Sequence, residues 1–149
     1  MQAFPHHYTV NATAYDARGV ALSSDGLPSI VSAPPAEFDG PGDIWSPETL
    51  FVAAIADCYV LTFCAVATVQ RLAWTTIACH IDGVVDRPDR VTQFVGFDLH
   101  AQLRVPAGTD MQLATRVLLQ AKHACLITHS LKAPVRLHIA VAQELLGAA

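Results

Sequence analysis

The chain has little charge for its length. Charged residues make up 15% of its 149 residues, with 9 Lys and Arg against 13 Asp and Glu, and the formal net charge is −4. No cluster of Lys or Arg is present, so the sequence lacks the positive patch typical of proteins that bind nucleic acid or anionic membranes. Apolar residues make up 52%, which excludes disorder and leaves little polar surface for a monomer. We therefore expect no nucleic-acid partner and an obligate oligomer.

The sequence also lacks closely spaced cysteines, and its first residues lack the pattern of a signal peptide. Its four cysteines, Cys58, Cys64, Cys79 and Cys125, form no C-x-x-C pair, which argues against a zinc ribbon. Residues 1–8 have neither the basic flank nor the apolar run of a signal peptide. We therefore expect a cytoplasmic protein with reduced thiols, so the cysteines are interpreted as buried, catalytic or metal-binding before they are interpreted as structural disulfides.

Residues 50–69 are poor in polar side chains and about as long as a membrane span. Asp57 lies in the middle of this segment, and a central aspartate costs about 3 kcal/mol on membrane insertion. The rest of the chain has the patterns of ordinary amphipathic strands and helices. We therefore expect the segment to be a buried helix of a protein with no membrane partner.

Secondary-structure patterns indicate an α+β domain. Residues 8–15 and 30–32 alternate as strands on either side of a turn signal at 24–26, which predicts a three-stranded meander. Ser46 is a suitable N-cap before Pro47, so a helix is expected from there to about Leu72. Strand patterns follow at 75–85, 93–105 and 135–141. Between the last two, a helix is expected from its N-cap Thr109 to Ala124, followed by a short helical or turn segment at 126–132.

This order predicts antiparallel sheets packed around a long central apolar helix. We expect one domain over residues 1–149. Its parts are a meander and loop at 1–43, the central helix at 44–72, and a hairpin, helix, second cysteine segment and last strand at 73–149.

Two cysteine segments and one turn carry a family resemblance. Residues 45–58 place Ser-Pro-Glu-x-Leu before a cysteine on the apolar helix, residues 121–132 carry the second cysteine, and residues 16–19 place an arginine at a strand turn. In these features the sequence resembles the OsmC/Ohr family of thiol-dependent hydroperoxide reductases, over most of its length. The resemblance implies an OsmC-like fold in an intertwined homodimer.

The resemblance also implies a peroxidase that reduces organic hydroperoxides to alcohols in defence against oxidative stress. Cys58 would be the thiolate that attacks the peroxide, and Cys125 the thiol that condenses with the resulting sulfenic acid. Arg18 and Glu48 would assist: apolar surroundings disfavour a thiolate, and Arg18, oriented by the Glu48 carboxylate, would offset that cost. No bound cofactor is implied, and an external dithiol, of the lipoyl type or another thiol, would reduce the Cys58–Cys125 disulfide.

The rise of a helix places Glu48 and Cys58 about 15 Å apart along its axis. If both serve one site, the simplest arrangement is a twofold dimer with antiparallel helices, in which the partner subunit's Glu48 reaches Cys58. Adjacent helical residues diverge by about 100°, so Asp57 is expected to point away from the Cys58 sulfur. Cys64 and Cys79 are interpreted as packing residues, the commonest role of a free cysteine.

Other functions stay open at this point. The spacing of His123, Cys125 and His129 could gather metal ligands, but no acidic cluster accompanies them, so we expect no bound metal. A binding protein for a small apolar or acyl ligand on the same scaffold would keep Cys58 and Cys125 as reduced core residues. A thiol redox sensor would form their disulfide without turnover.

Overall fold

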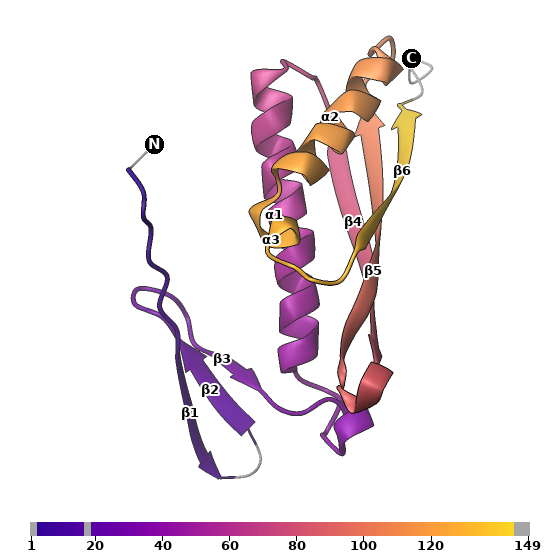
Figure 1. Cartoon of the computed structure of the whole chain (residues 1–149). Coiled ribbons are helices and arrows are strands. Elements are labelled where there is room, and N and C mark those ends of the chain that lie inside the picture. The colour runs from indigo at the N-terminus through magenta and orange to yellow at the C-terminus, as the bar shows by residue number, and fades with distance from the viewer. Residues whose placement is uncertain (1–2, 17–18, 145–149) are drawn as a thin grey trace. The chain divides into compact units, whose positions relative to one another are not determined.

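The computed structural model describes residues 3–16 and 19–144 (Figure 1). Across these residues the fold is α+β, with two three-stranded sheets and three α-helices, and the predicted fold class is confirmed. The chain divides into two compact units, Met1–Phe51 and Val52–Ala149. Helix α1 (Pro47–Val69) runs from the end of the first unit into the second.

The first unit carries a small antiparallel sheet. Its strands β1 (Asn11–Asp16), β2 (Gly19–Ser23) and β3 (Ile30–Ser32) pair in the order β1-β2-β3. The predicted turn follows β2, where Gly26 has a φ of 75° and the Leu27 N–H donates to the Ser24 carbonyl at 3.1 Å. A positive φ favours glycine, which explains the turn signal in the sequence. A 3-10 turn, η1 (Ala36–Phe38), then leads toward α1.

Helix α1 begins where the sequence predicts. The Thr49 N–H donates to Ser46 Oγ at 3.1 Å, and the Ser46 N–H donates to Thr49 Oγ1 at 2.8 Å. This reciprocal pair satisfies donors that the first turn leaves free, in the manner of a capping box. Pro47 follows at the first helical position, where the lack of an N–H costs nothing.

The helix ends three residues earlier than the predicted Leu72. Arg71 has a φ of 54°, and the Leu72 N–H donates to the Ala67 carbonyl at 2.9 Å while the Arg71 N–H donates to Thr68 at 3.2 Å. These bonds form a Schellman motif, which closes the helix after Val69. This end could not be predicted from a glycine at the C-cap, because the residue with the left-handed backbone is an arginine.

The second unit contains a sheet that corrects the prediction of wholly antiparallel sheets. Strands β4 (Thr76–Asp86) and β5 (Gln93–Val105) form the predicted hairpin through the 3-10 turn η2 (Pro88–Arg90). Strand β6 (Val135–Gln143), however, pairs with β5 in parallel. The reason is the crossover: α2 (Met111–Ala124) and α3 (Leu126–His129) carry the chain back along the sheet before β6 starts.

Helices α1 and α2 cover one face of this sheet (Figure 1). From α1, the buried residues form a stripe at four-residue spacing, Ile55, Tyr59, Phe63 and Ala67. The inward side chains of β5 and the apolar face of α2 complete the core, with Leu99, Ala101, Leu103, Val105, Ala114, Val117, Leu118 and Ala121 all nearly inaccessible.

The other face of the sheet is polar. His80, His100 and His138 lie in one cross-strand row, and the His100 and His138 rings stack with centroids 4.5 Å apart. Beside them, Arg136 donates two hydrogen bonds to the Asp98 carboxylate at 2.9 and 2.6 Å, and His138 Nε2 lies 2.9 Å from it. Hydrogen bonds from Arg136 and His138 hold the pKa of Asp98 well below its usual range.

Two further findings concern the helices. Asp110, rather than the predicted Thr109, caps α2, since its carboxylate accepts from the Gln112 N–H at 2.8 Å. Within the described residues, α1 has the length and composition that could cross a membrane. A helix in the core of a soluble protein has the same properties, so this finding is weak evidence for a span.

Candidate active site

The structure brings Cys58 and Cys125 together. Cys58 lies on α1 and is half-buried, whereas Cys125 lies between α2 and α3 and is wholly buried. Their sulfur atoms are 3.2 Å apart, and both thiols are free, with Cys125 Sγ donating to Cys58 Sγ. Two thiols at this separation need only a small movement to form a disulfide, whose sulfurs stand about 2.05 Å apart.

The bend between α2 and α3 fixes Cys125. Its backbone is extended, with φ −70° and ψ 110°, so the chain turns sharply at this residue. Its carbonyl accepts from the His129 N–H at 3.2 Å and from Thr128 Oγ1 at 2.9 Å, which are the first bonds of α3. These two hydrogen bonds hold the backbone of Cys125 in place, and its side chain points into the core toward Cys58 of α1.

Burial governs the protonation of Cys125. Removal from water raises the pKa of this thiol, and its hydrogen bond to Cys58 acts in the same direction, while hydrogen bonds from Thr128 act against it. Cys125 therefore keeps its proton, and its S–H donates a hydrogen bond to Cys58 Sγ.

An open groove of about 500 Å³ lies over Cys58. Helix α1 forms one wall and α3 the other, and the groove is lined by Ala54, Asp57, Cys58, Leu61, Thr62, Ala65, Leu126 and Ile127. Asp57, which is expected to point away from the Cys58 sulfur, is exposed and also lines this groove. The groove gives a small molecule a route to Cys58 along a mostly apolar surface.

Cys79 is a third thiol close to the pair, which sequence reasoning had left as packing. It lies on the inward face of β4, against the same core as Cys125 and Tyr59. Burial, followed by the charge of Cys125, raises the pKa of Cys79 to about 11. The alternation of β4 could have placed Cys79 inward, but nothing in the sequence indicated that Cys125 would lie nearby.

Glu48 lies in the first unit, in the first turn of α1. It lines an apolar cavity of about 280 Å³ together with residues such as Val20, Pro34 and Phe38. Its Oε2 atom is buried and has no hydrogen-bond partner in the described part of the chain. A carboxylate oxygen in such surroundings requires a donor. Arg18, the predicted donor, lies outside the described residues.

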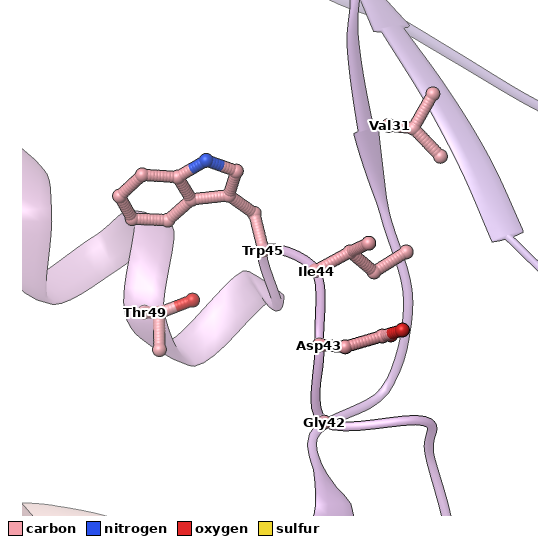
Figure 2. Close-up of a pocket in the computed structure, with 6 residues that line it drawn as sticks. All are labelled: Val31, Gly42, Asp43, Ile44, Trp45 and Thr49. Carbon is pink, nitrogen blue, oxygen red and sulfur yellow. The ribbon is translucent and has the colours of Figure 1, made fainter.

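A second hollow of the first unit, about 450 Å³ in volume, lies at the approach to α1 (Figure 2). Ile44 and Asp43 point to one side of the loop, and the indole of Trp45 points to the other. Of the predicted site residues that the structure describes, Glu48, Cys58 and Cys125, none lines this hollow.

The histidines near Cys125 do not converge. His129 Nε2 lies 2.5 Å from the His123 carbonyl oxygen, so this ring nitrogen is engaged with the backbone. Between residues 3 and 144, apart from 17 and 18, no group of three or more His, Cys, Asp or Glu residues is placed to hold a metal ion.

Comparison with known proteins identifies relatives over nearly the whole chain. A family model described as OsmC-like protein matches residues 40–140. The chain is 24% identical over 148 residues to the uncharacterized protein YmaD of Bacillus subtilis (strain 168), and the match covers 95% of this chain and 97% of YmaD.

Solved structures share the fold. An OsmC-like protein of unknown function from Vibrio cholerae has a TM-score of 0.82 at 20% identity, covering 91% of this chain and 100% of its own. An organic hydroperoxide resistance protein OsmC from Legionella pneumophila has a TM-score of 0.72 at 25% identity, covering 93% of this chain and 99% of its own.

Proposed function

The chain belongs to the OsmC-like protein family, and on that premise we propose that it is a thiol-dependent peroxidase that reduces organic hydroperoxides to alcohols. The observation that carries the proposal is the 3.2 Å separation of the Cys58 and Cys125 sulfurs, with Cys58 on the groove and Cys125 behind it. The organic hydroperoxide resistance protein of similar fold supports the substrate class.

The proposed reaction has three steps. The Cys58 thiolate attacks the distal oxygen of the hydroperoxide, the O–O bond breaks, and the alkoxide takes a proton and leaves as the alcohol. Cys125 then attacks the sulfur of the Cys58 sulfenic acid, and water leaves as the disulfide forms. An external dithiol, of the lipoyl type or another thiol, reduces the disulfide through a mixed disulfide and is itself oxidised.

Burial supports this division of roles. A hydroperoxide entering the groove meets Cys58, because Cys125 is wholly buried. Cys125 remains close enough to trap the sulfenic acid before a second peroxide oxidises it further. The apolar lining, including Leu61, Leu126 and Ile127, favours an organic hydroperoxide over hydrogen peroxide.

Glu48 and Arg18 complete the proposed site. The buried Oε2 atom of Glu48 supports a role as acceptor for a guanidinium. Since Glu48 and Cys58 stand apart on one helix, we propose that the partner subunit's Glu48 serves Cys58 in a cytoplasmic homodimer. Residues 1–149 would then act as one domain within that dimer.

The decisive experiment measures turnover of an alkyl hydroperoxide with a dithiol reductant. We expect activity in the native protein, none in Cys58→Ser, and near-native activity in the control Cys64→Ser, whose thiol lies on the same helix. Turnover unaffected by Cys58→Ser would overturn the assignment of Cys58 as the reacting thiol. Absence of turnover in the native protein would overturn the proposed peroxidase function.

Mass spectrometry after one equivalent of peroxide separates the remaining candidates. The peroxidase hypothesis predicts that the protein mass falls by two hydrogens and that a peptide linked through Cys58 and Cys125 is found. A binding protein would leave both thiols reduced, and a redox sensor would form the link without catalytic turnover.

A further inference from the structure

Thr128 lies against Cys125 at the bend between α2 and α3. It follows Cys125 by three residues, within α3. Its Oγ1 atom is 2.9 Å from the Cys125 carbonyl oxygen and 3.5 Å from the carbonyl oxygen of Lys122, near the end of α2. The Thr128 hydroxyl is therefore held at the bend, close to the Cys125 side chain.

Thr128 also contacts the Cys125 sulfur itself. Burial raises the pKa of the Cys125 thiol, and the hydrogen bond to Cys58 acts in the same direction, whereas hydrogen bonds from the N–H and the hydroxyl of Thr128 lower it. Tyr59 and Cys79 also interact with Cys125, but burial raises the pKa of each of them, so both keep their protons. Among these neighbours, Thr128 is the one whose hydrogen bonds favour a thiolate at Cys125.

We propose that Thr128 stabilises the Cys125 thiolate and thereby activates this thiol for disulfide formation. The proposal rests on the proposed function, because Cys125 is taken as the thiol that condenses with the Cys58 sulfenic acid. A hydroxyl has one proton to donate, and a charged thiolate is a stronger acceptor than a neutral carbonyl oxygen. The Thr128 hydroxyl donates to the Cys125 carbonyl oxygen while the thiol is protonated, and it turns toward the sulfur when the proton leaves.

The Cys125 thiolate takes part in two steps. In the first, the Cys125 sulfur gives up its proton and attacks the Cys58 sulfur, the S–O bond of the sulfenic acid breaks, and the leaving hydroxide takes up a proton to become water. In the second, a thiolate of the external dithiol attacks the half-buried Cys58 sulfur, and the electron pair of the S–S bond goes to the buried Cys125 sulfur. Thr128 thus favours the nucleophile of one step and the leaving group of the other.

Closure of the disulfide can be followed without any peroxide. The aromatic disulfide dithiobis(nitrobenzoate) reacts with the Cys58 thiolate, leaves half of the reagent on that sulfur and releases one thionitrobenzoate. Attack by Cys125 on the labelled Cys58 sulfur then releases a second thionitrobenzoate and forms the disulfide. In protein that also carries Cys64→Ser and Cys79→Ser, the absorbance of thionitrobenzoate therefore reports the reaction of each remaining thiol in turn.

Thr128→Val removes the hydroxyl and nearly keeps the size of the side chain. We expect it to slow the second release about three- to tenfold at neutral pH, because the thiolate loses a hydrogen bond, and to leave the first release unchanged. The slowing should disappear at alkaline pH, where Cys125 is a thiolate in both proteins, so the midpoint of the pH–rate profile should rise. Thr128→Ser keeps the hydroxyl and should restore the native rate and midpoint.

The matched control is Thr68→Val on α1. Thr68 Oγ1 donates to the Cys64 carbonyl at 2.9 Å, so this variant removes a bond of the same kind and length from a site away from the pair, and both releases should stay unchanged. A second release that Thr128→Val leaves unchanged would overturn the proposal. So would a slowing that is equal at every pH, or one that Thr128→Ser does not reverse, because the loss would then come from packing.

Peroxide should give the corresponding result in catalysis. We expect a longer-lived Cys58 sulfenic acid in Thr128→Val, and therefore more sulfinic acid on the Cys58 peptide than in the native protein at the same excess of peroxide. Equal amounts in the two proteins would overturn the role of Thr128 in the peroxide reaction. If the native protein turns over no hydroperoxide, the proposed function fails, while the two releases of thionitrobenzoate still decide whether Thr128 activates Cys125.

Discussion

Cys58 and Cys125 have the same side chain in different surroundings. Cys58 is half-buried beside an open groove, whereas Cys125 is enclosed between α2 and α3 and holds its proton because burial raises its pKa. Reactivity of a thiol depends on access and on thiolate character. These surroundings therefore favour Cys58 as the first sulfur to be oxidised and Cys125 as the second to react.

Replacement of Cys125 by serine should expose Cys58 to over-oxidation. Without a neighbouring thiol, the Cys58 sulfenic acid has no partner with which to condense, so excess peroxide should convert it to sulfinic acid. We expect a mass gain of two oxygens on the Cys58 peptide in Cys125→Ser. The control Cys79→Ser should give the disulfide instead, and sulfinic acid at equal levels in both variants would contradict the role of Cys125.

At the residue scale, the sequence could identify the two thiols but not their environment. Cys58 and Cys125 were found from the segments that surround them. That Asp57 points away from the Cys58 sulfur stays a prediction, made from α1 alone. In the structure, Leu126 and Ile127 of α3 form an opposite wall, and the resulting groove is wide enough to include both Asp57 and Cys58.

Helix α1 is apolar on all sides, yet only one stripe of it is deeply buried. Phe63 belongs to this stripe, is fully inaccessible and packs edge-on against Trp74 with centroids 5.5 Å apart. On the outer side Leu61 is 61% exposed, and at the end of the helix Val69 is 80% exposed. The buried stripe holds the helix to its sheet, and the exposed side remains available for other contacts.

Truncation of the buried stripe should therefore cost much more than truncation of the exposed residues. We expect Phe63→Ala to lower the free energy of unfolding by about 3–5 kcal/mol, since it leaves a cavity in the core. Val69→Ala should change it by no more than about 0.5 kcal/mol. Urea denaturation of the two variants gives the comparison, and equal losses would show that the stripe is not the anchor.

Periodicity could not have found this stripe, because a helix with apolar residues all round has no preferred face in its sequence. The start of a helix and the positions of strands were easier to predict from the sequence. Ser46 before Pro47, for example, correctly predicted the start of α1. The direction of β6 was missed for a different reason. Residues 109–132 form a helical crossover, and a strand that follows such a crossover returns parallel to the strand before it.

The parallel pair β5–β6 is joined on its outer face by Asp98 and Arg136. Because the folded pKa of Asp98 is lowered, its contribution to stability is present above the ordinary carboxyl pKa and is lost as pH falls through the folded value. We expect Asp98→Asn to be less stable than the native protein at pH 7. This difference should shrink as pH falls from 5 to 2, in urea midpoints measured at each pH.

Asp82→Asn provides the control for this titration. Asp82 lies on the same face but is 63% exposed and 3.3 Å from His80, so Asp82→Asn should change the urea midpoint only slightly. A constant difference between native protein and Asp98→Asn across this range would contradict the assignment.

Many large apolar side chains are exposed in the described part of the molecule. Large apolar side chains are exposed on α1, on the loop before it and near the tip of the β4–β5 hairpin, among them Leu61, Trp45 and Val84. Apolar surface of this extent usually marks a site of association. Together with the low charge of the chain, it supports the homodimer that the proposed site requires.

A charge on the exposed side of α1 should separate such a dimer. We expect the native protein to sediment as a dimer at low micromolar concentration and Leu61→Asp to sediment as a monomer, because burying an unpaired carboxylate is costly. Leu119→Asp, at a 44% exposed position on α2, is the control and should remain dimeric. A native protein that is monomeric at all these concentrations would exclude the dimer.

The 3.2 Å contact of the two sulfurs spans 67 residues of chain. A bond between them would close a loop of that length in the unfolded state, and the lost chain entropy corresponds to about 4 kcal/mol of added stability. Oxidation would then raise the melting temperature and slow proteolysis, and reduction would reverse both. The disulfide form, which would accumulate when peroxide is in excess over the reductant, would thus be harder to unfold than the reduced form. A thermal melt would therefore report the redox state of the two thiols.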